Sequence, residues 1–198
     1  MKSESSAPVN ARRLEIIDGC IQTFMRYGYK KTSMDDLARS IGLSRQALYL
    51  NFSDKATLFK ATVGRVIERL REAGQEALGN EAEPIEARLG RAFDEVHGHS
   101  VGYDTLDEIL ETSVQMVGPV FDEFEVTFQA DLAKALQVAG VARRWKSPRV
   151  TAELLAAQLY AASKGHKHLS SSAEVYRERM RGAIHLVCRS PEQLPSTA

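Results

Sequence analysis

The side chains best suited to binding chemistry lie in the stretch from Ser33 to Lys55, SMDDLARSIGLSRQALYLNFSDK. Arg45 carries a guanidinium group that can pair bidentately with the edge of a guanine, and the amide of Gln46 can pair in the same way with an adenine. Tyr49 follows Arg45 by one helical turn, and its hydroxyl group suits a phosphate oxygen. These residue types, presented together, predict a surface that contacts duplex DNA.

Polar residues on both sides of this set could hold the DNA backbone. Lys55 follows Asp54, the predicted cap of the next helix, and a helix N-terminus beside a lysine is a good phosphate anchor. Thr32 and Ser33 could contact the backbone from the other side. Leu50 is an apolar residue on this polar face, and two interpretations stay open with equal weight: a contact with a thymine methyl group, or an incidental exposed leucine.

Two short helices and a tight turn must position these side chains. Ser33 and Asp36 have the spacing of a capping box, which starts the first helix. Gly42 stands where the chain must turn, because glycine adopts a left-handed conformation without steric cost. Ser44 is placed to cap the second helix, and apolar residues four apart, beginning at Leu48, bury one face of it.

The charge of the chain is distributed unevenly. Residues 1–60 contain ten Lys or Arg and six Asp or Glu residues, a net charge of +4, whereas the remaining residues contain 16 basic and 20 acidic residues, a net charge of −4. A basic N-terminal part favours electrostatic attraction of that end to DNA. The alternative for the whole motif is an ordinary pair of antiparallel helices with a solvated polar face.

The motif and the amphipathic helices on either side of it resemble the TetR family of bacterial transcription regulators over roughly residues 10–65. The resemblance is carried by Phe24, Tyr27, Gly28, Ser33, Leu37, Ala38, Gly42, Leu43, Ser44, Leu48, Tyr49, Asn51, Phe52, Lys55, Leu58 and Phe59. It implies that Tyr49 and Lys55 contact phosphates and that the positions from Arg45 to Ala47 face the bases. Leu50 and Asn51 depart from the family pattern, which often has aromatic residues or His there.

We therefore predict two sets of DNA-contacting residues. The base-reading set is Arg45, Gln46, Ala47, Leu50 and Asn51. The phosphate-contacting set is Thr32, Ser33, Ser44, Tyr49 and Lys55.

The rest of the chain predicts an all-α fold of about nine helices, because apolar residues recur every three or four positions and no strand-like alternation appears. The predicted parts are a flexible arm over residues 1–9, a helix-turn-helix DNA-binding domain over 10–70 with its motif at 33–52, a larger ligand-binding and dimerisation domain over 71–190, and a polar tail over 191–198. No apolar run is long enough to span a bilayer, and no signal peptide is recognised. We therefore expect a cytoplasmic protein without a membrane partner.

Two C-terminal helices favour a homodimer. The segment 150–165 is dense in small residues, and Gly182 and Ala183 match it in the last helix. Small residues let helices approach closely, so two such helices from each subunit can form a four-helix interface, which the family resemblance also implies. Close packing within one chain is the alternative. The predicted interface is Ala156, Leu159, Tyr160, Ser163, Met180, Ala183, Ile184 and Val187.

The resemblance also implies a ligand cavity in the larger domain, with plain core packing as the alternative for each of its residues. The predicted cavity residues are Tyr103, Met116, Phe121, Phe124, Phe128 and Trp145. His97 with His99, and His166 with His168, could suggest metal pairs, but residues two apart on a helix point to nearly opposite sides. We expect no metal and no cofactor.

The predicted function is sequence-specific regulation of transcription. The family resemblance implies a repressor that acts as a homodimer on a palindromic operator and is released by a small-molecule effector. A helical adaptor that binds only protein would use the same amphipathic helices, but it would not need these DNA-contacting residue types on one face. An all-α enzyme is the remaining alternative, and the sequence has no Gly-rich phosphate loop after a strand, GxSxG motif or HExxH motif.

Overall fold

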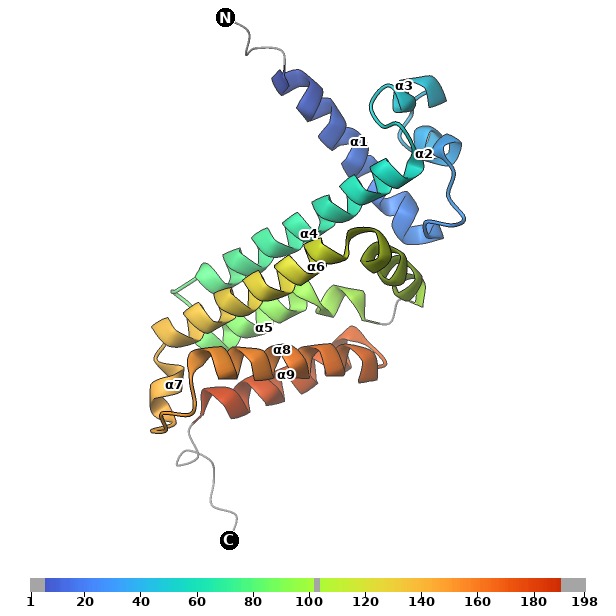
Figure 1. Ribbon diagram of the computed structural model, residues 1–198. Coiled ribbons are helices and arrows are strands. Elements are labelled where there is room, and N and C mark those ends of the chain that lie inside the picture. The colour runs from blue at the N-terminus through green and yellow to red at the C-terminus, as the bar shows by residue number, and fades with distance from the viewer. Residues whose placement is uncertain (1–5, 102–103, 190–198) are drawn as a thin grey trace, which may run out of the picture. The chain divides into compact units, whose positions relative to one another are not determined.

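The computed structural model describes residues 6–101 and 104–189. Over that part of the chain it contains nine α-helices, one 3₁₀ helix and no strand (Figure 1). The prediction of an all-α fold is confirmed. None of the described helices is long and apolar enough to cross a membrane.

The N-terminal unit contains residues up to Glu68 together with the part of α6 that ends at Phe121. Its helices are α1 (Ser6–Tyr27), α2 (Met34–Ser40), α3 (Arg45–Tyr49) and the first part of α4 (Lys55–Gly79). Because α1 begins at Ser6, part of the segment 1–9 that we predicted as an arm is helical, and residues 1–5 lie outside the described residues.

The predicted helix caps around the turn of this unit are present. The Ser33 hydroxyl accepts a hydrogen bond from the Asp36 backbone N–H at 3.2 Å, and the Asp36 carboxylate accepts one from the Ser33 N–H at 3.1 Å. Hydrogen bonds from the Ser33 hydroxyl and the Ser33 N–H to the Asp36 carboxylate lower the pKa of Asp36. Gly42 has a φ of 70°, and the Ser44 hydroxyl accepts from the Ala47 N–H at 3.1 Å. Local hydrogen bonds therefore fix where α2 and α3 begin.

The core of the N-terminal unit is aromatic and aliphatic. The ring of Phe59 on α4 lies 5.1 Å from the ring of Phe24 and 4.8 Å from the ring of Tyr29. Leu48 and Phe52, on and just after α3, are fully buried. Since α3 has only five residues in helical conformation, this buried side holds it in place, and the opposite side is left in solvent.

The C-terminal unit starts at Arg69 within α4 and excludes the part of α6 before Asp122. Its further elements are α5 (Ile85–Val96), η1 (Gly98–Ser100), the later part of α6 (Asp104–Val138), α7 (Val141–Arg144), α8 (Ala152–Leu169) and α9 (Ala173–Cys188). The helix α6 is interrupted at Val117, with φ −141° and ψ 28°, just before Pro119. The unit is therefore discontinuous in sequence, unlike the predicted continuous domain over 71–190.

A buried chain of hydrogen bonds links α5, α8 and α9. His97 Nδ1 and Ser163 Oγ are 2.6 Å apart, Ser163 Oγ and the Tyr176 hydroxyl are 2.6 Å apart, and that hydroxyl donates to the Phe93 carbonyl at 3.2 Å. Because a carbonyl can only accept, the protons must run in one direction, from His97 Nδ1–H through Ser163 to Tyr176 and Phe93.

Burial of the His97 ring favours its neutral form. Burial lowers the pKa of His97 to about 3, with a further contribution from nearby Lys167 and Lys164. This histidine is a buried structural residue, and no group of three or more His, Cys, Asp or Glu in the described part of the chain could hold a metal.

Candidate nucleic-acid interface

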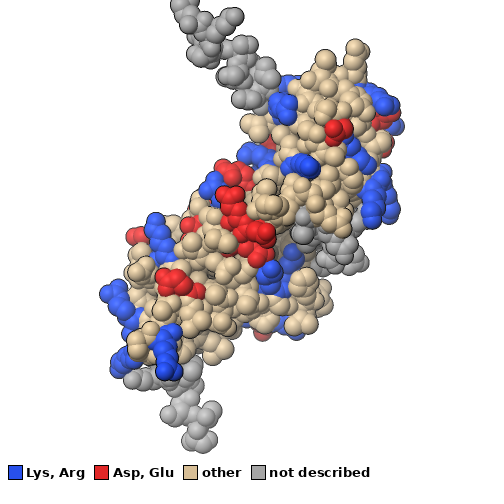
Figure 2. Space-filling model, viewed as in Figure 1, with Lys and Arg blue, Asp and Glu red and all other residues tan. Residues whose placement is uncertain are grey.

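The exposed face of α3 presents most of the predicted base-reading side chains. Arg45, Gln46, Tyr49 and Leu50 are all exposed, whereas Leu48 between them is buried. On the side drawn in Figure 2, basic side chains are scattered over the N-terminal unit with few acidic ones among them. Leu50 is 83% exposed, so packing within the protein does not account for this leucine, and both interpretations of it remain open.

Arg45 is oriented before any ligand arrives. Its guanidinium lies 3.2 Å from the carboxylate of Asp35 on α2 and 5.4 Å from the centre of the Tyr49 ring. Hydrogen bonding to Tyr49 and the charge of Asp35 raise the pKa of Arg45. Because solvent screens this exposed ion pair, a base edge or phosphate can replace Asp35 as the partner of Arg45.

Two of the predicted DNA-contacting residues each have a polar group that is hydrogen-bonded within the protein. Thr32 is 3% exposed, and its hydroxyl donates to the Gly28 carbonyl at 2.6 Å. Asn51 is half-buried, and its amide donates to the carbonyl of Ala47, itself half-buried, at 3.0 Å. Asn51 stands just beyond α3 and bonds a carbonyl of its last turn, whereas Thr32 bonds the carbonyl of Gly28, the residue that follows α1. Ser33 and Ser44 are exposed at the starts of α2 and α3.

Lys55 has an internal role that the sequence did not predict. Its ammonium donates to the carbonyls of Tyr29 and Thr32, both at 2.9 Å, and lies 4.2 Å from the centre of the Tyr29 ring. The half-buried side chain therefore joins the turn between α1 and α2 to the start of α4. In the free protein, Lys55 is not the unengaged phosphate anchor that we predicted.

Replacing Lys55 with methionine tests this role. We expect weaker DNA binding because two carbonyls lose their partner, at a cost of about 1–3 kcal/mol of folding stability. The slope of log K against log salt concentration should not change, whereas loss of a phosphate contact reduces it by about 0.9. Lys60→Met, an exposed lysine on the same helix, serves as the control for stability. A reduced slope with unchanged stability would contradict the internal role.

Sequence reasoning missed Arg13. Its guanidinium lies 4.4 Å from the centre of the Phe52 ring and donates to the Asn51 carbonyl at 2.6 Å. Arg13 therefore links α1 to the end of α3 and helps to position the exposed face. No local signal identifies this residue, because an arginine in an amphipathic helix has the appearance of a solvated side chain.

The predicted cavity residues that the structure describes are divided between the two units. Phe124 and Phe128 are buried, and the Phe128 ring packs edge-on against Phe93 at 5.7 Å. The Trp145 indole donates to the Val187 carbonyl at 3.0 Å. Met116 and Phe121 belong to the N-terminal unit, and Tyr103 lies outside the described residues. The described clefts of about 410 and 310 Å³ in the C-terminal unit are lined by other residues.

Most residues of the predicted dimer interface are buried within the single chain. Six of them are buried inside the chain: Ala156, Leu159, Tyr160, Ser163, Met180 and Ile184. Ala183 and Val187 are half-buried. The apolar pattern of α8 and α9 marks the side that packs against the rest of the chain, so the side available to a partner must be sought on the opposite faces.

Comparisons with known proteins agree with this geometry. Residues 16–62 match the family described as bacterial regulatory proteins, tetR family. The chain is 39% identical over 70 residues to the HTH-type transcriptional repressor Rv1474c of Mycobacterium tuberculosis. The matched residues make up 35% of this chain and 37% of that protein. It is 28% identical over 105 residues to the HTH-type transcriptional repressor ComR of Escherichia coli, covering 53% of this chain and 50% of that protein. The matches thus span half or less of these relatives.

The fold similarity extends over nearly the whole chain. The crystal structure of a TetR-family transcriptional regulator from Pectobacterium atrosepticum superposes with a TM-score of 0.66, covering 93% of this chain and 95% of that one. The sequence identity is 19%, so this similarity concerns the fold alone.

Proposed function

We propose that this chain, which belongs to the tetR family of bacterial regulatory proteins, is a sequence-specific DNA-binding regulator of transcription. The observation that carries the proposal is the exposed face of α3, where Arg45, Gln46 and Tyr49 lie together on a capped helix whose other side is buried. The family match coincides with this element, since it covers residues 16–62.

The mechanism follows from where these groups lie. The first turn of α3 enters the major groove, where Arg45 and Gln46 pair with base edges. The Tyr49 hydroxyl and the exposed hydroxyls of Ser33 and Ser44 bond phosphate oxygens, which fix the position of the helix on the duplex. Arg13 holds the chain at the end of α3, and Lys55 holds the start of α4, through hydrogen bonds to backbone carbonyls.

A second copy of the chain is part of the proposal. The outer faces of α8 and α9, which lie side by side in Figure 1, carry Leu154, Ala161, Gly165, Gly182 and Leu186, all exposed. A glycine inside a helix costs about 1 kcal/mol relative to alanine. Apart from the adjoining helix backbone, no atom of the described residues lies within 4 Å of the Cβ that Gly165 or Gly182 would carry. These glycines instead leave room for the helices of a partner subunit.

A twofold dimer doubles the reading surface. One α3 contacts only a few base pairs, whereas two copies can read a palindromic operator with half-sites about 34–36 Å apart. Repression with release by a small effector completes the proposal: a ligand that binds one arrangement of the dimer more tightly shifts the population toward it. Both curated relatives compared above are named repressors, and a cytoplasmic location fits this role.

Selection of duplexes from random DNA, followed by a salt titration of the selected site, tests the function. We expect an enriched palindrome whose affinity falls steeply with salt. Arg45→Ala and Tyr49→Ala should each weaken binding by about 1–3 kcal/mol, because each removes a contact that other residues cannot replace. Arg143→Ala changes an exposed arginine of the other unit and serves as the matched control.

Two results would count against the proposal. Full DNA binding by folded Arg45→Ala and Tyr49→Ala proteins would show that α3 is not the reading helix. The failure of any duplex to be enriched would instead favour the helical adaptor that binds only protein.

A further inference from the structure

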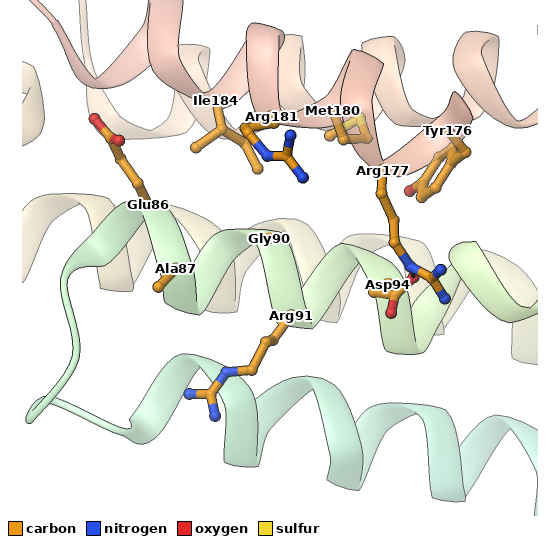
Figure 3. A pocket seen from close by; sticks show the side chains of 10 residues that line it. All are labelled: Glu86, Ala87, Gly90, Arg91, Asp94, Tyr176, Arg177, Met180, Arg181 and Ile184. Carbon is orange, nitrogen blue, oxygen red and sulfur yellow. Dashed lines mark hydrogen bonds and ion pairs between the residues drawn. The ribbon is translucent and has the colours of Figure 1, made fainter. Parts of the chain in front are cut away.

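A groove of about 410 Å³ lies between α5 and α9 in the C-terminal unit (Figure 3). Its walls come from one face of each helix, and Tyr176, Met180 and Ile184 on the α9 side are buried apolar or aromatic residues. Opposite them α5 presents only small side chains, at Ala87 and Gly90. The absence of large side chains on α5 leaves the space between the two helices open.

Paired polar side chains lie at both ends of the groove. The Arg177 guanidinium lies 2.7 Å from the Asp94 carboxylate, and the His185 imidazole lies 3.9 Å from the Glu86 carboxylate. The later residue of α9 pairs with the earlier residue of α5, so the two helices run antiparallel along the groove.

Midway between these two pairs, α5 has a glycine, Gly90, where the four-residue spacing of Glu86 and Asp94 would place a third acidic residue. Gly90 lies four residues from both Glu86 and Asp94, and Arg181 lies four residues from both Arg177 and His185. Arg181 and Gly90 therefore occupy the central position on the two walls, and the Arg181 side chain extends into the space between the helices in Figure 3.

Arg181 has no carboxylate partner among the residues that the structure describes. The other groove arginines are already paired, Arg177 with Asp94 and Arg91 with Glu83 at 2.8 Å. Nothing lies within 4 Å of the Cβ that Gly90 would carry. The groove thus holds one guanidinium without a carboxylate partner, with open space and the small apolar residues Ala87 and Gly90 opposite it.

We infer that this groove binds a small monocarboxylate with an apolar body. The carboxylate takes the place of the missing acid and pairs with Arg181 through two hydrogen bonds, while the apolar body lies against the exposed Ala87 and the half-buried Gly90. A groove of this volume falls within the range of small-molecule sites, roughly 300–1,000 Å³. Glu86 and Asp94 at the ends disfavour dianions. The inference names the class of the proposed effector and depends on the proposed function only for its regulatory meaning.

Calorimetric titration of the full chain with octanoate and with octanamide tests the inference. The two probes share an apolar body, and only octanoate carries the charge that Arg181 needs. We expect octanamide to bind about tenfold more weakly or worse, and Arg181→Gln to weaken octanoate binding by a similar factor. Arg149→Gln, an exposed arginine elsewhere in the same unit, should bind octanoate as the unaltered protein does.

Substitutions of Gly90, on the α5 wall of the groove, test the inference from the side opposite Arg181. Gly90→Glu supplies an acid at the open central position, so this variant should lose octanoate binding and gain thermal stability. Gly90→Ala adds a methyl group without charge and should bind octanoate within about threefold of the unaltered protein.

Equal affinities for octanoate and octanamide would overturn the inference, as would octanoate binding that survives in Arg181→Gln. Dissociation of a dimer by Arg181→Gln, without carboxylate binding by the unaltered protein, would overturn it too, because a second copy would then supply the acid. DNA binding is measured separately. If the protein binds octanoate but not DNA, the proposed function is contradicted and this inference stands. If it binds DNA but not octanoate, this inference is contradicted and the proposed function stands.

Discussion

Replacing Leu48 with alanine is expected to lower the free energy of unfolding of the N-terminal unit by about 2–5 kcal/mol, because it empties a fully buried position. The same replacement at Leu50 is expected to change this free energy by less than about 0.5 kcal/mol, because that side chain is 83% exposed. The two leucines stand two residues apart at the end of α3 and share their chemistry. The pair therefore isolates burial as the cause of the difference.

Chemical denaturation followed by circular dichroism measures this difference. Similar losses of stability in both variants would mean that Leu50 packs against something in solution. Leu50→Ala then serves a second purpose, because it leaves the fold intact. If this variant loses affinity only for operators with a thymine at one position, Leu50 contacts the thymine methyl group. Unchanged affinity for every operator identifies an incidental exposed leucine.

Gly182→Arg is expected to convert a dimer into a monomer and to weaken operator binding by about 10²–10⁴-fold. The arginine places a large charged side chain where α9 has open space and where we propose that the partner subunit packs. A monomer has one α3 and therefore loses the gain in affinity that two linked binding sites provide. That gain is typically about 10²–10⁴-fold. Light scattering gives the mass of the particle, and titration of a palindromic duplex gives the affinity.

The control for this change is Ala130→Arg, at an exposed position of α6. It adds the same charge to the same unit away from α8 and α9, so the mass and the affinity should both stay as they were. A Gly182→Arg protein that remains dimeric and binds its operator fully would show that the outer face of α9 is not the interface.

Features that depend on neighbouring residues could be predicted from the sequence. The capping box of Ser33, the left-handed Gly42 and the cap at Ser44 are all present, and so is the buried face of α3. Their physical causes act within a few residues, through hydrogen bonds to free backbone groups and through helical spacing. The family resemblance over these residues is confirmed as well.

Features that depend on distant residues were not predictable in this way. The bonds of Lys55 to Tyr29 and Thr32 span 26 and 23 residues, and that of Arg13 to Asn51 spans 38. A charged side chain has the same appearance in sequence whether it meets solvent, a phosphate or a backbone carbonyl.

The burial of the predicted interface residues could not be foreseen for a related reason. Helical periodicity shows which residues share a face of α8 or α9, but it does not show which face turns inward. The small residues are spread over both faces: Ala156 and Ser163 are buried, whereas Ala161 and Gly165 are exposed. Composition alone therefore could not assign the outer surface.

The buried chain of hydrogen bonds from His97 to the Phe93 carbonyl limits which ligand shapes the groove between α5 and α9 can accept. It ties Tyr176 at one end of the groove wall to the backbone of α5 and to Ser163 of α8. Rolling α9 away from α5 would leave these buried groups without partners, at about 1–3 kcal/mol each. The groove should therefore keep a constant width, so it should reject branched or bulky acids by shape and accept slender ones of the same charge.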